Sequence, residues 1–165
     1  MTTTDHTEAR IIEVRPQRLV KCLDQGKIVI AAGFQGVSTA GEITTLGRGG
    51  SDTTAVALGV ALQAAKVEFY KDVPGIFEED PKKNPCARRH LQLSYDEALE
   101  IVHEGSEVLH PRSIVLAKKN NLPLVVRSFS QEARGQHAGT RIHFPGENGN
   151  RRPAYEQESL HQCPV

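Results

Sequence analysis

The chain has 165 residues, enough to form one hydrophobic core, and its twenty basic and twenty acidic residues cancel to zero net charge. This balance provides no global field that would favour nucleic acid or an anionic membrane surface, so neither is expected as a partner. No apolar run is long enough to span a membrane, and residues 1–6 lack the basic and apolar regions of a signal peptide, which predicts a cytoplasmic protein.

The first predicted elements are a short helix over 18–23 and a buried strand over 27–32. Two short runs, 34–37 and 42–46, flank a Gly-bearing turn and predict a β-hairpin. A long helix is predicted next, over 51–66.

Further along, residues 67–70 are predicted to form a short apolar strand. Ser94 is expected to cap a helix that runs through His103, because Glu97 stands at capping-box spacing. Pro111 opens another helix, through Lys119, and 123–128 is a predicted strand. Strands and helices in alternation indicate an α/β fold with a mainly parallel sheet and helices on both faces, a three-layer αβα sandwich.

Residues 143–165 differ in kind from the rest of the chain. Pro, Gly, Asn, Arg, Gln and Glu dominate the segment, and it has almost no apolar periodicity. A segment of this composition buries too little apolar surface to offset the conformational entropy that it would lose on folding. We therefore predict a disordered tail that follows a folded part over 1–142.

Residues 44–55 (TTLGRGGSDTTA) contain the most informative pattern. Gly49 and Gly50 let backbone N–H groups approach a ligand closely, and Ser51 or Asp52 is positioned to cap the helix that follows. The helix N-terminus carries partial positive charge, and Arg48 adds a guanidinium able to bind a carboxylate with two hydrogen bonds. The pattern predicts a site for an anionic substrate; the alternative is a Gly-rich turn that only connects a strand to a helix.

The sequence of residues 45–52 (TLGRGGSD) resembles the substrate-binding motif of aspartate kinases (aspartokinases), members of the amino acid kinase superfamily. Further blocks match in the family's order and together cover about residues 6–142. They are 29–36 (VIAAGFQG), 70–77 (YKDVPGIF), 79–82 (EDPK), 93–98 (LSYDEA), 108–112 (VLHPR) and 123–128 (PLVVRS).

The resemblance covers only the C-terminal half of that family's catalytic domain. The N-terminal Lys-Phe-Gly-Gly motif, which brings a phosphate-contacting lysine, is not found, nor are regulatory ACT domains. We therefore expect a partial amino acid kinase domain over 1–142: a fragment, a truncated product or one piece of a split enzyme. The expected partners are the N-terminal half of the domain or further copies of the chain.

On the substrate side, the resemblance implies that Arg48, Gly49, Gly50, Ser51 and Asp52 bind L-aspartate or organise its site. Asp52 is the candidate catalytic residue, as an anchor for the substrate ammonium group or for a catalytic lysine. Its alternative role is a plain helix cap.

On the nucleotide side, the resemblance implies ATP with Mg²⁺ as cofactors. Asp72 would lie at the adenosine and phosphates, Phe77 beside the base and Lys82 near the phosphates. The other expected contributors are Lys71, Asp80, Glu107 and Val108. For the turn at 80–82 the alternative is a solvated charged loop.

Glu107 is the main departure, because many relatives carry a lysine there. A carboxylate would repel the triphosphate unless it turns away, pairs with Lys118 or Arg112, or holds Mg²⁺. No metal site made of the chain's own histidines and cysteines is expected, since the three cysteines lack a Cys-x-x-Cys pair and the histidines lack ligand spacing.

The activity implied is transfer of the ATP γ-phosphate to the side-chain carboxylate of L-aspartate, which gives 4-phospho-L-aspartate. This is the first step of lysine, threonine and methionine biosynthesis. One alternative is a non-catalytic nucleotide-binding or regulatory subunit of the same fold. A second is a kinase for another small acid such as glutamate.

Overall fold

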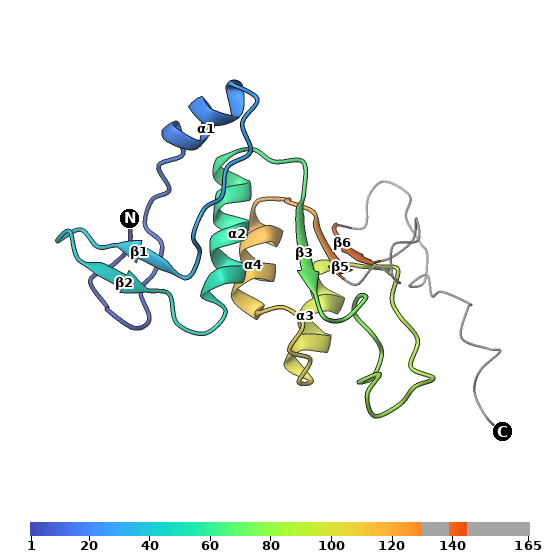
Figure 1. The fold of residues 1–165 in the computed structure, drawn as a ribbon. Coiled ribbons are helices and arrows are strands. Elements are labelled where there is room, and N and C mark those ends of the chain that lie inside the picture. The colour runs from blue at the N-terminus through green and yellow to red at the C-terminus, as the bar shows by residue number, and fades with distance from the viewer. Residues whose placement is uncertain (130–138, 145–165) are drawn as a thin grey trace. The chain divides into compact units, whose positions relative to one another are not determined.

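The computed structural model describes residues 1–129 and 139–144 (Figure 1). The chain divides into two compact units, Met1–Ala65 and Lys66–Val165.

Unit 1 contains two helices and a β-hairpin. Helix α1 spans Gln17–Asp24 and helix α2 spans Gly50–Ala61. Strands β1 (Gln35–Val37) and β2 (Ile43–Thr45) pair antiparallel, with Gly36 opposite Thr44. The predicted short helix and hairpin are therefore confirmed, whereas α2 ends five residues before the predicted end of the long helix.

The amino-terminal segment holds β2 in place. The hydroxyls of Thr2 and Thr44 are hydrogen-bonded at 2.6 Å, and both residues are buried. The backbone N–H of Thr45 donates to His6 O and its carbonyl accepts from Ala9 N, each at 2.9 Å. These bonds fix the end of β2, from which the Gly-rich loop begins.

The prediction of a buried strand over 27–32 is wrong. These residues form no regular element in the structure, and the side chains of Ile28 and Ile30 are 96% and 97% exposed. Strand propensity alone cannot form a strand, because its backbone N–H and C=O groups need a neighbouring strand to pair with.

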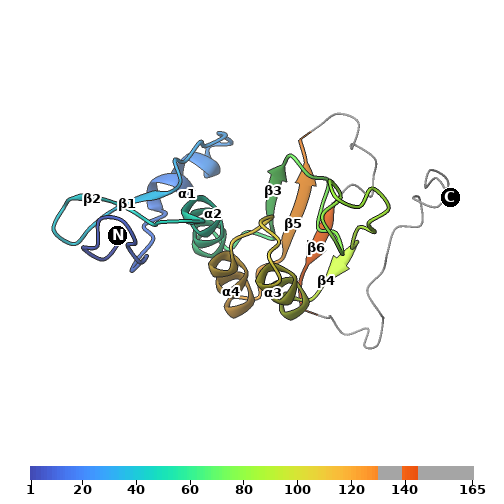
Figure 2. The ribbon, with the colours of Figure 1, turned by 90° about the horizontal axis from the view of Figure 1, so that it is seen from below.

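Unit 2 is built on a four-stranded sheet in the order β3-β5-β6-β4. β3 pairs parallel with β5, β5 antiparallel with β6, and β6 parallel with β4. Figure 2 shows helices α3 and α4 side by side along one face of this sheet. The bounds of the elements are β3 Val67–Lys71, β4 Gln92–Leu93, α3 Tyr95–His103, α4 Pro111–Lys119, β5 Leu124–Ser128 and β6 Thr140–Ile142.

Both helices of unit 2 begin and end as the sequence predicts. The Ser94 side chain accepts from the Glu97 N–H at 3.2 Å, and the Glu97 carboxylate accepts from the Ser94 N–H at 2.7 Å, which completes the capping box. Pro111 is the first residue of α4, and the His110 ring caps that helix by accepting from Arg112 N. These local signals act within one turn, so they are readable without the tertiary structure.

The α/β class with a mainly parallel sheet is confirmed, since two of the three strand pairings within the four-stranded sheet of unit 2 are parallel. Strands β4 and β6 were not predicted, because runs of two and three residues are too short to show a period. The predicted disordered tail lies almost wholly outside the described residues, and the predicted domain division stays a prediction.

A buried histidine supports a prediction about stability and pH. His90 is 6% exposed, and its pKa is lowered, mainly by burial, against the opposing charges of Glu78 and Glu97. Below about pH 6.5 the unfolded chain binds a proton that folded His90 resists, so the free energy of unfolding falls as the pH decreases. Urea unfolding at pH 7.5, 6.5 and 5.5 should show this decline, and His90→Gln should flatten it. An equally steep decline in the variant would assign it to other groups.

Candidate functional site

The Gly-rich loop joins β2 to α2 through two left-handed residues. Gly47 and Gly49 have φ angles of +71° and +72°, a region in which a side chain is strained. Gly49 is the N-cap of α2, and the Gly50 N–H donates back to Gly47 O at 3.0 Å. The predicted Ser51 or Asp52 cap is therefore wrong: no side chain caps α2, and the helix begins one residue earlier.

The loop also leaves no space at Gly50. A Cβ there would lie 2.9 Å from Leu46 Cβ and 3.0 Å from Phe34 Cδ2. Phe34 itself has a φ of +73°, and it is tied to both ends of the loop: Leu46 N donates to its carbonyl at 2.9 Å, and its N–H donates to Thr54 Oγ1 at 3.2 Å. Glycine at position 50 is thus a packing requirement.

The residues predicted to bind substrate come together at the first turn of α2. Arg48 and Ser51 are exposed, Asp52 is half-buried, and all three lie within one turn of the Gly49 cap. The Gly50 N–H is already bonded to Gly47 O, so what this end of α2 offers is mainly the partial positive charge of a helix N-terminus. Ser51 takes no part in a cap, so its hydroxyl is not committed to the helix end.

A pocket of about 800 Å³ lies in unit 2, where β3 ends. Its wall is formed by the residues that follow β3 and by the turn after α3. All seven residues predicted to bind nucleotide line it: Lys71, Asp72, Phe77, Asp80, Lys82, Glu107 and Val108.

Thr140 on β6 anchors the loop that forms this pocket. Its buried hydroxyl accepts from the Ile76 N–H at 2.8 Å and donates to the His90 carbonyl at 2.5 Å. A Cβ at Gly75 would lie 2.6 Å from the same hydroxyl, so glycine is needed for this approach. Sequence reasoning missed both residues, since their partners lie some fifty or more positions away.

Asp80 shapes the turn that carries Lys82. Its carboxylate accepts from the Lys82 N–H at 2.9 Å, and its carbonyl accepts from the Lys83 and Asn84 N–H groups. This is a local turn held by an aspartate side chain. Asp80 therefore acts on the pocket by placing the lysines, and its own carboxylate is partly committed to the turn.

The charges around the pocket are mostly negative. Three lysines, 71, 82 and 83, stand among six carboxylates, those of residues 72, 78, 79, 80, 104 and 107. Glu107 is exposed on this wall. The suggested pairing of Glu107 with Lys118 is not found, because Lys118 Nζ lies 2.5 Å from Asp96 Oδ1 instead.

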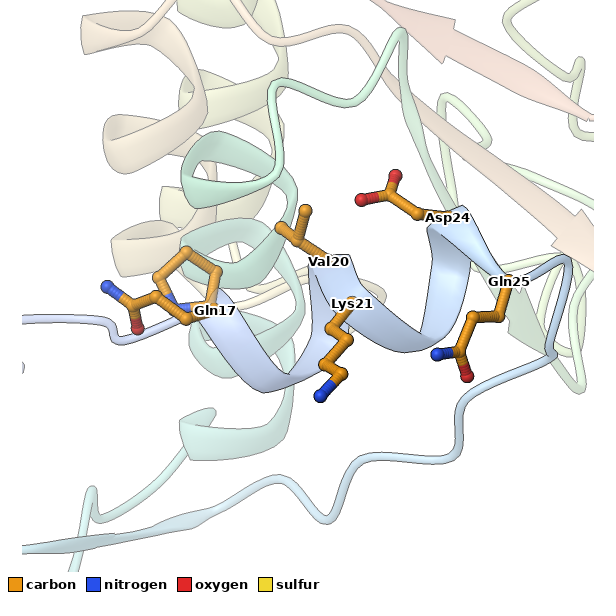
Figure 3. Close-up of a pocket in the computed structure, with 6 residues that line it drawn as sticks. Gln17, Val20, Lys21, Asp24 and Gln25 are labelled. Atoms are coloured by element: carbon orange, nitrogen blue, oxygen red, sulfur yellow. The ribbon is translucent and has the colours of Figure 1, made fainter.

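A second, shallower hollow of about 470 Å³ lies along α1 in unit 1 (Figure 3). It is lined by side chains of the helix and its two ends, including Val20, Lys21 and Asp24. No predicted site residue lies there, and the hollow is open to solvent, so we do not assign it a function.

The described residues contain no helix that is both long and apolar enough to cross a membrane. In the same ranges, 1–129 and 139–144, no three His, Cys, Asp or Glu side chains are grouped so as to hold a metal ion.

The fold and the Gly-rich loop agree with a family match. Residues 1–128 match the model of the amino acid kinase family, and the chain belongs to that family. Within it, the chain is 54% identical over 130 residues to an aspartokinase of Geobacillus stearothermophilus, which covers 79% of this chain and 32% of that protein.

Similar solved structures support the same family assignment. The chain is similar to E. coli aspartokinase III in complex with aspartate and ADP, with a TM-score of 0.77 and 34% identity over 89% of this chain and 33% of that one. It is less similar to a UMP kinase from Bacillus anthracis, with a TM-score of 0.58 and 26% identity over 79% of this chain and 52% of that one. The chain spans about a third of the length of the aspartokinases it matches.

Proposed function

We propose that this chain is part of an aspartate kinase, which transfers the ATP γ-phosphate to the side-chain carboxylate of L-aspartate to give 4-phospho-L-aspartate. The observation that carries the proposal is the TLGRGGSD loop, held at the N-terminus of α2 with no side-chain cap and no space for a side chain at Gly50. Support comes from relatives named aspartokinase at about half identity and from a similar structure that holds aspartate and ADP.

Aspartate would bind at the loop. The Arg48 guanidinium is exposed beside the helix N-terminus, and its planar fork matches a carboxylate with two parallel hydrogen bonds. The partial positive charge at the N-terminus of α2 would attract the same anion. Asp52, half-buried in that turn, would hold the substrate ammonium group, because a carboxylate repels the acidic end of aspartate.

The nucleotide would bind in the pocket of unit 2. Phe77 would contact the base, and Lys71, Lys82 and Lys83 would contact phosphates. Asp72, at the carboxyl end of β3, stands where open α/β sheets bind ligands. These lysines are needed because the reaction brings two anions together, so charge neutralisation and alignment dominate catalysis.

Mg²⁺ fits this pocket as part of the nucleotide complex. The described residues provide no three-ligand cluster, yet carboxylates such as that of Asp72 line the wall. Mg²⁺ usually takes one or two protein carboxylates and fills its remaining positions with phosphate oxygens and water. When bound it would neutralise phosphate charge, which an acidic pocket makes especially necessary.

The remaining parts of the proposal follow from the reaction. Acyl phosphate formation on aspartate is the first step toward lysine, threonine and methionine, and we place it in the cytoplasm. The complete site would include the N-terminal part of the kinase domain, on this chain or another, or further copies of the chain.

A non-catalytic nucleotide-binding subunit is the second candidate. The observation in its favour is the excess of carboxylates over lysines around the pocket, with Glu107 among them. A kinase for glutamate is less favoured, because Arg48 lies in a loop whose sequence is close to that of aspartate-specific kinases. A hydroxamate assay on the chain combined with the N-terminal part of an aspartokinase separates the three. The proposal predicts aspartate-dependent acyl phosphate, the subunit predicts none, and equal use of glutamate would end the specificity claim.

Reversing the charge at position 107 tests the nucleotide pocket. Glu107→Lys should tighten Mg-ATP binding about tenfold, because it removes a repulsive charge and adds an attractive one near the phosphates. Calorimetric titration measures this, with Glu100→Lys as the control, since Glu100 is an exposed acid on α3 that does not line the pocket. Equal tightening by both variants would reflect net charge, and no effect of Glu107→Lys would place the phosphates elsewhere.

A further inference from the structure

A single buried hydroxyl closes the base of the loop over residues 76–90, which we call the pocket loop. Thr140 Oγ1 accepts from the Ile76 N–H at 2.8 Å and donates to the His90 carbonyl at 2.5 Å. Ile76 and His90 are the two ends of the loop, and the His90 N–H also donates to Ile76 O at 2.9 Å. The hydroxyl therefore bonds both arms of the loop at the point where they come together.

From this base the loop extends along one wall of the nucleotide pocket. The Glu78 N–H donates to Arg88 O at 3.0 Å, and Phe77 forms a β-bridge with Arg89, so the two arms stay paired just above the base. The arm that leaves the base, 77–83, lines the pocket with every one of its residues. A displacement at the base would therefore displace this whole wall.

Thr140 is itself held by the sheet. It is fully buried and stands opposite Val126 in the pairing of β5 with β6, and β6 also pairs with β4. A Cβ at Gly139 would lie 2.6 Å from Val126 O, and a Cβ at Gly75 would lie 2.6 Å from the Thr140 hydroxyl. The hydroxyl thus reaches the loop from a paired strand, through a space too narrow for a further side chain.

Thr140 does not line the pocket, and its buried side chain has no access to a ligand there. It can act on a nucleotide only through the loop that it holds. Loss of the hydroxyl would leave the N–H of Ile76, a buried residue, without its acceptor. An unsatisfied buried donor is costly, and opening of the loop at its base would relieve that cost.

We propose that Thr140 is a positioning residue for the nucleotide: its hydroxyl holds the pocket loop in the conformation that binds the base and the phosphates. The inference rests on the proposed function for its ligand, a nucleoside polyphosphate with Mg²⁺. It differs from a general contribution to stability, which would lower the free energy of unfolding and leave the affinity of the folded protein unchanged.

The test compares Thr140→Val with the unchanged chain in calorimetric titrations of the full 165-residue protein with Mg-ADP. Valine has nearly the shape of threonine but no hydroxyl, so we expect the Kd for Mg-ADP to rise about tenfold and the Ile76 amide hydrogen to exchange faster by a similar factor. Thr140→Ser restores the hydroxyl and should return both values to within about threefold of the unchanged chain. If Thr140→Val fails to fold, Thr140→Cys takes its place, because a thiol is a weaker donor and acceptor of similar size.

Tyr95→Phe is the matched control. It also removes one buried hydroxyl that donates to a backbone carbonyl, that of Leu122 at 2.7 Å, and both residues belong to unit 2. Neither residue lines the pocket. We therefore expect Tyr95→Phe to lower the free energy of unfolding, measured in urea, but to leave the Kd for Mg-ADP within about twofold.

Four outcomes would overturn the inference: an unchanged Kd in Thr140→Val, equal weakening by Tyr95→Phe, no recovery in Thr140→Ser, or no saturable binding of Mg-ADP by the unchanged chain. Kinase activity, measured on the chain combined with the N-terminal part of an aspartokinase, separates the two proposals. Mg-ADP binding that depends on Thr140, without aspartate-dependent turnover, leaves the inference standing and removes the proposed function. Aspartate-dependent turnover with a KM for ATP that Thr140→Val does not change does the reverse.

Discussion

Arg48→Ala is expected to raise the aspartate requirement of the reconstituted kinase by roughly two to three orders of magnitude and to leave the ATP requirement nearly unchanged. Truncating one partner of a hydrogen-bonded charge pair typically costs about 2–5 kcal/mol when the other partner is left unpaired. Arg48 is exposed at the N-terminus of α2 in unit 1, whereas the nucleotide pocket is lined by residues of unit 2. Steady-state kinetics with each substrate varied in turn measures the effect.

Arg48→Lys provides the matched control for this prediction. It keeps the charge but loses the planar fork, so it should recover only part of the aspartate affinity. Equal losses for aspartate and ATP in Arg48→Ala would instead indicate a structural role for the guanidinium. Full activity in Arg48→Lys would mean that aspartate binding depends only on the positive charge at this position.

The 165-residue chain by itself is expected to turn over aspartate at least a thousandfold more slowly than kinases usually do, which is on the order of 1–100 per second. Six carboxylates surround the three lysines of its pocket, and residues 28–32 lack a paired strand next to the substrate loop. Loss of a positioned charge in such a site commonly costs a factor of about 10² to 10³ in rate.

Purification of the chain, light scattering for its oligomeric state and an acyl phosphate assay test this prediction together. Addition of the N-terminal part of an aspartokinase should restore turnover. Turnover at ordinary kinase rates by the chain alone would show that its own residues, or a self-associated form of it, already complete the site.

The parts of the structure that the sequence predicts well are those fixed by local chemistry. The capping box of Ser94 and Glu97, the Pro111 start of α4 and the hairpin around Gly41 each depend on residues within a few positions. The seven predicted nucleotide residues come from two separate stretches, 71–82 and 107–108, and the structure brings both to one pocket. Their roles there remain predictions.

The parts that failed depend on distant partners. Residues 27–32 have strand propensity but no neighbouring strand, and β6 pairs with β4 and β5 through only three residues. Thr140 supports the pocket loop across 64 positions, which no local pattern reveals. The helix cap failed for a different reason: Gly49 adopts the left-handed conformation, so α2 begins before the serine and aspartate that a capping rule selects.

The identity of the phosphate acceptor tests the central claim most directly. The chain combined with the N-terminal part of an aspartokinase would be given γ-labelled ATP, Mg²⁺ and an equal mixture of L-aspartate, L-glutamate and UMP, the last because a UMP kinase shares the fold. We expect label in 4-phospho-L-aspartate, with at least a hundredfold less in the other two products, and loss of that label in Arg48→Ala. Label in UMP or glutamate at comparable levels, or an aspartyl phosphate signal that Arg48→Ala leaves unchanged, would contradict the account.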